Sequence, residues 1–497
     1  MINHLKFKSD KYNLLIIFGY VLTYLSLRLI SSPYLDWDEA EQFVLAKTFN
    51  FGDAHQAPLY GWIVQSISLI LGYKSLSIII VRYIALSTFL YFIYKSARVF
   101  HSAEKSFLFT NALLATILSY GYVINFKLTH SVLVFACSAA CFYYYLCLLN
   151  KATKQNYFLF SLSIALGMLS KFNFIFLISA IFFASLVFKR TRLLIFQTKS
   201  LISLFTITLI CSPYYLWLLR QGSESSAYID KRAELVNGDY NYLLYFLKLS
   251  LNSVFPLIAF VLVSVIFFYL SKPSNSTSNS IKPKENQDLL IWISIISCLC
   301  PVLAILIIKG SKLTGGWLAV THFIVALTVF NFFIDRISPK LQNYMLGIFF
   351  IVNLIFFLIK VTWIFAPDIH PKVHRIAIPY KQIIKKIEKN NAQDFKDINI
   401  FCDDQIICAN LELISASQNI QQFKDFKDLK RIFNTVHDHH IQGKSMIILN
   451  SYKDNPKFQS KLKQLAEKLE FKSKRTEIKH KYRYSKSQEF NIITFSF

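Results

Sequence analysis

The segment YLDWDEAEQF, residues 34–43, places four carboxylates, Asp36, Asp38, Glu39 and Glu41, directly after a long apolar run. A carboxylate can take a proton from an attacking hydroxyl group when it lies within hydrogen-bond distance. The D-x-D spacing of Asp36 and Asp38 also allows binding of a divalent metal. The pattern therefore indicates acid and base chemistry, with or without a metal, or else a solvated acidic loop.

Polar and basic side chains that could bind a phosphate or a sugar occur further along the chain, at His55, Gln56, Arg82, Lys171, Lys312 and His322. Cations that hold a phosphate, together with a carboxylate that accepts a proton, suit a reaction on a lipid-linked phosphate. Four of these residues also have a simpler explanation. Lys171 could snorkel to lipid headgroups, Arg82 could anchor there, Gln56 could cap an interfacial helix, and His322 could bond locally.

The composition defines the elements that must position these residues. The chain has 497 residues, 54% of them hydrophobic, and a mean hydropathy of +0.40, which excludes a soluble enzyme of this size and indicates a polytopic membrane protein. The net charge of +25 does not indicate nucleic-acid binding, because most Lys and Arg residues lie in short loops between apolar runs.

The apolar runs predict about eleven membrane-spanning helices, each long enough for a hydrocarbon core of roughly 30 Å. The predicted spans are 13–33, 76–94, 106–124, 131–149, 157–170, 172–188, 200–219, 250–270, 288–308, 317–334 and 342–365. With a cytoplasmic N-terminus, this count puts the basic turns inside and the C-terminal segment outside. The short run 58–71 is then an interfacial helix, and 157–188 is a hairpin that turns at LSKFN with Lys171 at its outer tip.

Two domains are expected, a membrane domain over residues 1–365 and a small extracytoplasmic α/β domain over 366–497. In the second, INIFC, MIILN and FNIITFSF have the pattern of strands, whereas DLKRIFNTVHDHH and PKFQSKLKQLAEKLEF have helical spacing. The HDHH cluster at 437–440 is interpreted as a solvated helix end and not as a metal site. Cys402 and Cys408 are either free thiols or a disulfide.

Three motifs in order, LDWDEAEQFVLAKTF, HQAPLYGWIVQ and LGMLSKFNFIF, resemble the polyprenyl-phosphate-sugar-dependent glycosyltransferases of the C-type (GT-C) fold, which include protein O-mannosyltransferases and lipid A aminoarabinose transferases. The resemblance covers roughly residues 13–335. It implies that Asp38 is the catalytic carboxylate and Glu39 its partner. It also implies donor-binding roles for the residues named above, His55, Gln56, Arg82, Lys171, Lys312 and His322.

One departure from the family pattern concerns the entry to the fourth helix. Many relatives carry an Asp in a TPDA-like turn there, whereas this chain reads LTHS, with Thr129 and His130. If that Asp helps to place the donor or a metal in relatives, His130 must do so differently here. The tentative metal site, Asp36 with Asp38, and the identity of the donor are therefore left open.

The sequence thus predicts an inner-membrane enzyme that inverts the anomeric carbon as it moves a sugar from a polyprenyl phosphate to lipid A, another envelope glycan or a protein. The main alternative is a transporter or flippase of lipid-linked sugars. Transporters tend to carry ionisable groups near mid-membrane in two related halves, and this chain shows no internal repeat. A non-catalytic scaffold is the second alternative.

Overall fold

The computed structural model describes residues 9–47, 49, 51, 56–72, 74–221, 234–236, 241–271, 284–312, 318–391, 398–415, 420–423, 425–431, 445–450, 454–468, 474–487 and 489–496. The chain divides into two compact units. The first unit contains residues 1–26, 48–72 and 79–357, and the second contains 27–47, 73–78 and 358–497. The expected domain boundary after residue 365 stays a prediction, because compact packing does not by itself show which segments fold independently.

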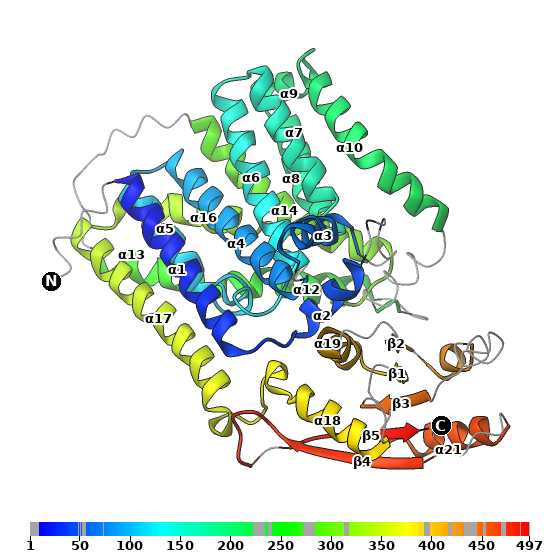
Figure 1. The fold of residues 1–497 in the computed structure, drawn as a ribbon. Coiled ribbons are helices and arrows are strands. Elements are labelled where there is room, and N and C mark those ends of the chain that lie inside the picture. Colours follow the sequence, from blue (N-terminus) through cyan, green and yellow to red (C-terminus); the bar gives the residue numbers. More distant parts are fainter. Residues whose placement is uncertain are drawn as a thin grey trace. The chain divides into compact units, whose positions relative to one another are not determined.

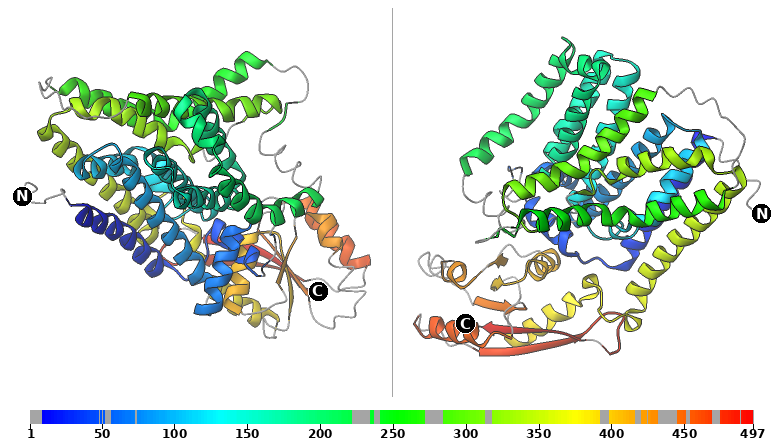
Figure 2. Two further views of the ribbon diagram at one scale, coloured as in Figure 1. Left: turned by 90° about the horizontal axis from the view of Figure 1, so that it is seen from above. Right: turned by 180° about the vertical axis from the view of Figure 1, so that it is seen from behind.

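The first unit is helical (Figures 1 and 2). Its helices, in chain order, are α1 (Asp10–Ser31), α3 (Leu59–Leu71), α4 (Lys74–Arg98), α5 (Ala103–Thr116), α6 (His130–Asn150), α7 (Lys154–Met168), α8 (Ile175–Val187), α9 (Lys189–Phe196), α10 (Ser200–Gln221), α12 (Tyr242–Val254), α13 (Ile258–Leu270), α14 (Lys284–Ile307), α16 (His322–Phe333) and α17 (Pro339–Phe365). Some residues of α1, α4 and α17 belong to the second unit.

Each predicted span coincides with helix in the structure, which confirms a mainly α, polytopic fold. Among the described residues, seven helical segments are long and apolar enough to cross a membrane, or eight if the pair 172–187 and 189–196, bent by 119°, counts as one. Helices α5, α7 and α16 coincide with the other predicted spans but contain 14, 15 and 12 residues. The exact number of crossings and their direction therefore stay predictions.

The hairpin at LSKFN is confirmed. Helix α7 ends at Met168, residues Phe172–Phe174 form a single 3₁₀ turn, and α8 follows from Ile175. Gly167 makes the tight turn possible, because a Cβ atom at this position would lie 2.3 Å from the ring of Phe174. Lys171 therefore lies in the turn between the two helices, where its backbone is extended.

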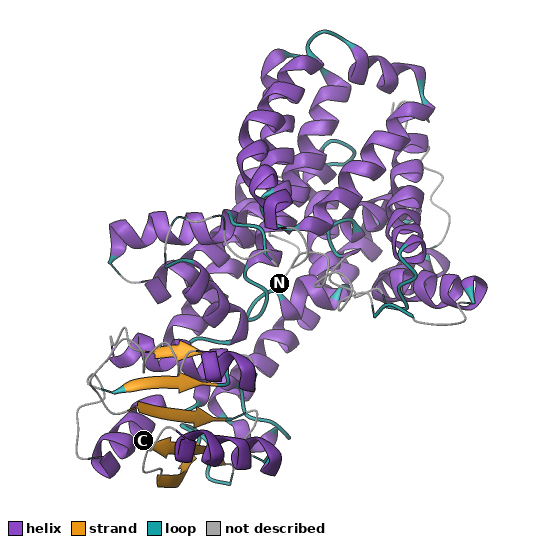
Figure 3. Ribbon diagram, turned by 90° about the vertical axis from the view of Figure 1, so that its right-hand side faces the viewer, coloured by secondary structure: helices purple, strands orange, loops and turns teal. Residues whose placement is uncertain are grey.

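The second unit contains a five-stranded mixed sheet with strand order β2-β1-β3-β5-β4 (Figure 3). Strand β1 (Asn399–Cys402) pairs in parallel with β2 (Ile420–Gln422) and β3 (Ser445–Leu449), whereas β5 (Glu489–Ser496) runs antiparallel to β3 and to β4 (Lys474–Lys481). Besides the parts of α1, α4 and α17 noted above, the unit contains the helices α2 (Trp37–Leu45), α18 (Tyr380–Asn391), α19 (Gln405–Ser415) and α21 (Pro456–Lys468), and residues 426–431 are also helical.

The α/β prediction for the C-terminal segment is confirmed. Phe401, Ile447 and Phe495 lie side by side on three neighbouring strands and are buried with Phe423 and Phe458 in one hydrophobic cluster. Strands β1, β3 and β5 and helix α21 lie where the sequence predicts them. The HDHH cluster at 437–440 lies outside the described residues. Cys402 and Cys408 are buried free thiols.

Candidate active site

The acidic segment begins a helix, α2, whose first residue is Trp37. Asp36 is its N-cap, and its side-chain carboxylate accepts from the backbone at N3 while Glu39 accepts from the Asp36 N–H at 2.9 Å, which completes a capping box. Such reciprocal bonds satisfy backbone donors that otherwise have no partner at a helix start. The DWDE sequence therefore fixes where the helix begins and which way its first side chains project.

A buried ion pair holds this helix start in place. Arg28 on α1 donates from Nε to Oε1 of Glu39 at 3.0 Å and from Nη2 to Oε2 at 2.6 Å, and the two side chains are only 1% and 0% exposed. The same guanidinium also donates to the carbonyl oxygens of Ser32 and Tyr34, each at 2.7 Å. Two parallel N–H···O bonds between a guanidinium and a carboxylate fix orientation as well as distance.

The segment that precedes α2 is also tied to the C-terminal part of the second unit. Ser32 Oγ donates to the carbonyl of Ile376 at 2.7 Å. The backbone of Leu35 both donates to Oδ1 of Asn410 at 2.7 Å and accepts from its Nδ2 at 3.1 Å. The acidic helix is therefore packed as part of the α/β unit, although more than 360 residues separate Leu35 from Asn410 in the sequence.

Asp38 differs from its two acidic neighbours in burial. Asp36 and Glu39 are 6% and 0% exposed, whereas Asp38, the second residue of α2, is only partly buried. Asp38 is thus the most accessible of these three carboxylates.

Glu39 is bonded within the protein in a way that would not suit a general base that contacts the substrate. Both of its carboxylate oxygens accept bonds from Arg28, and one also accepts the N–H of Asp36. These contacts give Glu39 the geometry of a partner that orients the helix carrying Asp38. They accord with the partner role inferred from the family resemblance, which itself stays a prediction.

Asp36 is also one of the two residues of the predicted metal site. Its Oδ1 accepts from the Trp37 N–H at 2.8 Å, and its Oδ2 lies 3.8 Å from Nε2 of His374, another buried residue. Among the described residues, no group of three or more His, Cys, Asp or Glu side chains is arranged to hold a metal ion. A metal site at Asp36 and Asp38 therefore stays a prediction.

The predicted phosphate ligand Lys171 belongs to the first unit. Its Nζ donates to Oγ of Ser131, near the start of α6, at 2.7 Å, and the residue is partly exposed at the turn of the hairpin. Arg82 on α4 is fully buried and donates from Nη1 to the carbonyl of Phe126 at 3.5 Å. Both cations contact the segment around residues 124–131, which leads into α6.

That segment contains the LTHS sequence. A five-residue π-helix, Ser119–Val123, precedes it, and Leu128 adopts a left-handed backbone with φ of 68°. Such a backbone is strained for a non-glycine residue, and strained residues and π-helices are enriched at functional sites. Thr129 is buried and His130 is the first residue of α6.

The remaining candidates of the first unit have varied surroundings. Lys312 is exposed and forms an ion pair with Glu234 at 2.5 Å. His322 is 1% exposed and hydrogen-bonds through Nε2 to the carbonyl of Ser253 at 3.3 Å, which matches the simpler explanation of a locally bonded histidine. Gln56 is partly buried just before α3, and His55 lies outside the described residues.

The structure thus brings Asp36, Asp38 and Glu39 together at one helix start in the second unit, whereas the basic candidates belong to separate elements of the first. Three site residues were missed by sequence reasoning: Arg28, His374 and Asn410. Arg28 carried a usable signal, because a single Arg inside an apolar run is costly unless it has a partner. Nothing in the local sequence marks His374 or Asn410.

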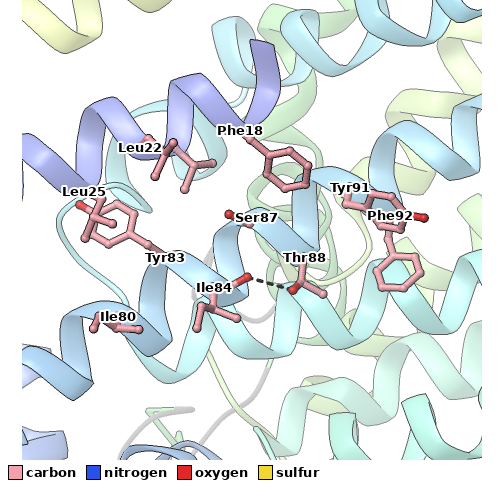
Figure 4. A pocket seen from close by; sticks show the side chains of 11 residues that line it. Phe18, Leu22, Leu25, Ile80, Tyr83, Ile84, Ser87, Thr88, Tyr91 and Phe92 are labelled. Carbon is pink, nitrogen blue, oxygen red and sulfur yellow. Dashed lines mark hydrogen bonds between the residues drawn. The ribbon is translucent and has the colours of Figure 1, made fainter. Parts of the chain in front are cut away.

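An apolar groove of about 390 Å³ lies between α1 and α4 in the first unit (Figure 4). Phe18, Leu22 and Leu25 line it from α1, and Ile80, Tyr83, Ile84, Ser87, Thr88, Tyr91 and Phe92 line it from α4. A second apolar pocket of about 280 Å³ shares Ile84, Thr88 and Phe92 with it and continues toward α3, α6 and α7. Linings of this kind suit a hydrocarbon chain and not a sugar.

Together, the helical bundle and the following α/β unit define a polytopic membrane protein of the GT-C type. A solved structure described as ArnT from Cupriavidus metallidurans in the apo state aligns with 96% of this chain and 98% of its own chain, with a TM-score of 0.57 and 10% identity. At this identity the likeness establishes the fold. It confirms the fold class predicted from the sequence.

Sequence comparison agrees over the first part of the chain. Residues 55–217 match the family model described as dolichyl-phosphate-mannose-protein mannosyltransferase. Two relatives from Rhizobium johnstonii are lipopolysaccharide core galacturonosyltransferases, RgtB, 27% identical over 201 residues, and RgtA, 24% identical over 225 residues. The matches cover 40% and 45% of this chain and 40% and 44% of the two relatives. The predicted resemblance to GT-C glycosyltransferases is thereby confirmed.

Proposed function

We propose that this chain is a membrane glycosyltransferase that moves a sugar from a polyprenyl phosphate to an acceptor of the cell envelope on the extracytoplasmic face. The mannosyltransferase family match, the ArnT-like fold and the two lipopolysaccharide core transferases support this function. The names of the two Rhizobium relatives favour the core of lipopolysaccharide as the acceptor, and the family model favours a protein. Lipid A and another envelope glycan are further candidates.

Asp38 acts as the general base in this reaction. It takes the proton of the acceptor hydroxyl, the acceptor oxygen attacks the anomeric carbon, and the bond from that carbon to the phosphate oxygen breaks. One displacement inverts the anomeric configuration. The polyprenyl phosphate leaves with the electron pair of the broken bond, and Lys171 together with other cations stabilises its negative charge.

The single observation that carries this assignment is the way the α2 helix start is built. Asp36 and Glu39 are buried and hold the first turn, and Arg28 fixes that turn through a buried ion pair, while Asp38 stays accessible. A carboxylate held in place before substrate binds loses little entropy in the transition state. The groove between α1 and α4 suits the isoprenoid chain of the donor.

The test uses purified protein in lipid nanodiscs with a polyprenyl phosphate sugar and a lipopolysaccharide acceptor. Asp38→Asn keeps the shape of the side chain but removes the base, so transfer should fall by about 10²- to 10⁴-fold with an unchanged unfolding temperature. Glu41→Gln on the same helix is the matched control and should retain activity. Undiminished transfer by Asp38→Asn would remove this residue from the mechanism.

Two further measurements separate the alternatives. Proteoliposomes loaded with labelled lipid-linked sugar distinguish transfer from translocation, and a flippase would move the lipid without releasing polyprenyl phosphate. A cysteine placed at the exposed Gln382 in α18 reports topology, since an extracytoplasmic C-terminal segment should react with an impermeant maleimide in intact cells. Labelling only after cell lysis would contradict the proposed orientation.

A further inference from the structure

Asn410 on α19 makes a pair of hydrogen bonds with a single peptide residue of the acidic segment. Its Oδ1 accepts the N–H of Leu35 at 2.7 Å and its Nδ2 donates to the Leu35 carbonyl at 3.1 Å, so the side-chain amide mimics a neighbouring β-strand. Both residues are 0% exposed. A buried amide that satisfies both polar groups of one backbone residue fixes position and orientation together.

The location of this pairing gives it a consequence for the site. Leu35 directly precedes the N-cap Asp36 and lies three residues before Asp38. Other contacts reach the same short segment from the C-terminal part of the second unit, among them Ser32 Oγ to the carbonyl of Ile376, His374 Nε2 opposite Asp36, and the edge-to-face ring pair of Tyr34 and Tyr380. A shift of Leu35 would therefore displace the whole first turn of α2, including Asp38.

A third hydrogen bond of Asn410 also supports a role in holding Leu35. Its Nδ2 also donates to the Ile406 carbonyl one helical turn earlier, at 2.9 Å, which locks the rotamer that faces Leu35. An Asn in a helix interior is unfavourable for helix formation. Its burial on α19 is therefore best explained by the partner that it reaches outside its own helix.

We propose that Asn410 is a positioning residue for Asp38, and that the α/β unit thereby forms part of the catalytic apparatus. Asn410 acts through Leu35 and does not touch the reacting atoms. This role rests on the proposed function for its kinetic consequences, whereas its structural consequence can be measured without any substrate.

The substrate-free test is hydrogen exchange on the full-length protein in nanodiscs. Asn410→Leu removes both bonds to Leu35, and the bond to the Ile406 carbonyl, at nearly constant volume. Amides in a peptide covering residues 33–40 should therefore exchange about tenfold faster or more while the sheet strands stay protected. Thr494→Val is the matched control, since it removes a buried side-chain bond to the Thr476 carbonyl in the sheet of the same unit. It should leave the 33–40 peptide unchanged.

The kinetic test compares kcat with KM. Misplacement of a catalytic group by about 1 Å can lower the rate by about 10²-fold. Asn410→Leu should therefore lower kcat by roughly that factor and leave KM for the donor within a factor of about two, whereas Thr494→Val should keep both values. Unchanged kcat in Asn410→Leu, or an equal loss in Thr494→Val, would overturn the positioning role.

A pH profile gives a signature that loss of stability alone would not produce. In Asn410→Asp the new carboxylate still accepts the Leu35 N–H, but when ionised it repels the Leu35 carbonyl. Burial raises the pKa of a carboxyl group, and once protonated this group can donate to that carbonyl as the amide does. The ratio of variant to wild-type kcat should therefore rise as the pH is lowered, and a constant ratio would contradict the two-bond pairing.

Failure of the function and failure of the positioning role have different outcomes. If the wild-type protein transfers no sugar but Asn410→Leu still loosens the 33–40 peptide, the glycosyltransferase assignment is wrong and the structural coupling holds. If the wild-type protein is active and Asn410→Leu changes neither exchange nor kcat, the coupling is wrong and the function holds.

Discussion

The acidic and the basic candidates are supported in different ways. The first turn of α2 rests on a buried network in which Arg28, Glu39 and Asn410 are each at most 1% exposed. Lys171 sits in the turn of the α7 to α8 hairpin, partly exposed, with a bond to the Ser131 hydroxyl. The carboxylate is therefore positioned by the folded protein, whereas a cation on a partly exposed turn keeps room to adjust to a phosphate.

This difference predicts that changes around the carboxylate affect stability as well as activity. Arg28→Met leaves Glu39 buried without its charge partner, so the protein should lose about 3 to 5 kcal/mol of stability along with its activity. Thermal unfolding in nanodiscs measures the loss. The double variant Arg28→Met with Glu39→Leu should regain much of the stability but not the activity. An unfolding temperature of Arg28→Met equal to that of the wild type would show that the network does not stabilise the fold.

Changes at the cation should have the opposite profile. Lys171→Met removes the charge that we propose stabilises the leaving phosphate, so transfer should fall by about 10²-fold with little change in unfolding temperature. Titration with polyprenyl phosphate should show weaker binding. Lys340→Met, at an exposed lysine of α17, is the charge-matched control. Equal binding by the two variants would assign Lys171 to the lipid headgroups instead.

The groove of the first unit gives a smaller and more selective effect. Ser87→Trp places an indole between α1 and α4. Donors with long isoprenoid chains should then show a KM raised by about tenfold, because roughly two methylene groups of the chain would no longer be buried. Donors truncated to short chains should be unaffected. Ser66→Trp, on the exposed face of α3, is the control. A similar KM change for both chain lengths would place the chain elsewhere.

The smallest expected effect concerns the α/β unit alone. The Lys486 N–H, together with bonds from the Ser485 and Ser487 side chains, holds the pKa of Asp368 well below its usual range. A carboxyl group with a lowered folded pKa stabilises the fold above its unfolded pKa of about 4, and that contribution is lost as the pH falls below it. Asp368→Asn should therefore lower stability at neutral pH and flatten the loss between about pH 4 and pH 2. Parallel acid unfolding curves for variant and wild type would contradict this.

Sequence patterns located most helices and the sheet because their signals are local. Apolar length revealed the spans, and the basic flanks of 157–188 revealed the hairpin that the structure contains at Lys171. The strands β1, β3 and β5 are short apolar runs between polar turns. The sequence does not predict strand β4, because its residues, KRTEIKHK, are mostly charged. Such a sequence is compatible with a strand here because β4 lies at the edge of the sheet and pairs only with β5.

The candidate site was only partly predictable for a physical reason. A carboxylate after an apolar run is visible in the sequence, and so is its position relative to a family motif. The group that holds it is not, because the pairing of Leu35 with Asn410 depends on contact between residues 375 positions apart. Glu39 shows the same limit, since its neighbours in the sequence do not reveal that Arg28 occupies both of its oxygens.

The wide sequence separation within the second unit has a consequence for biogenesis. Ribosomes add roughly 5 to 20 residues per second, so Leu35 emerges about 20 to 75 s before Asn410 exists to receive it. During that interval the segment before α2 lacks its hydrogen bonds to Asn410. Under the proposed function, a chain whose synthesis stops before Asn410 would lack the contact that positions Asp38, so transfer would begin only after the C-terminal segment has been made.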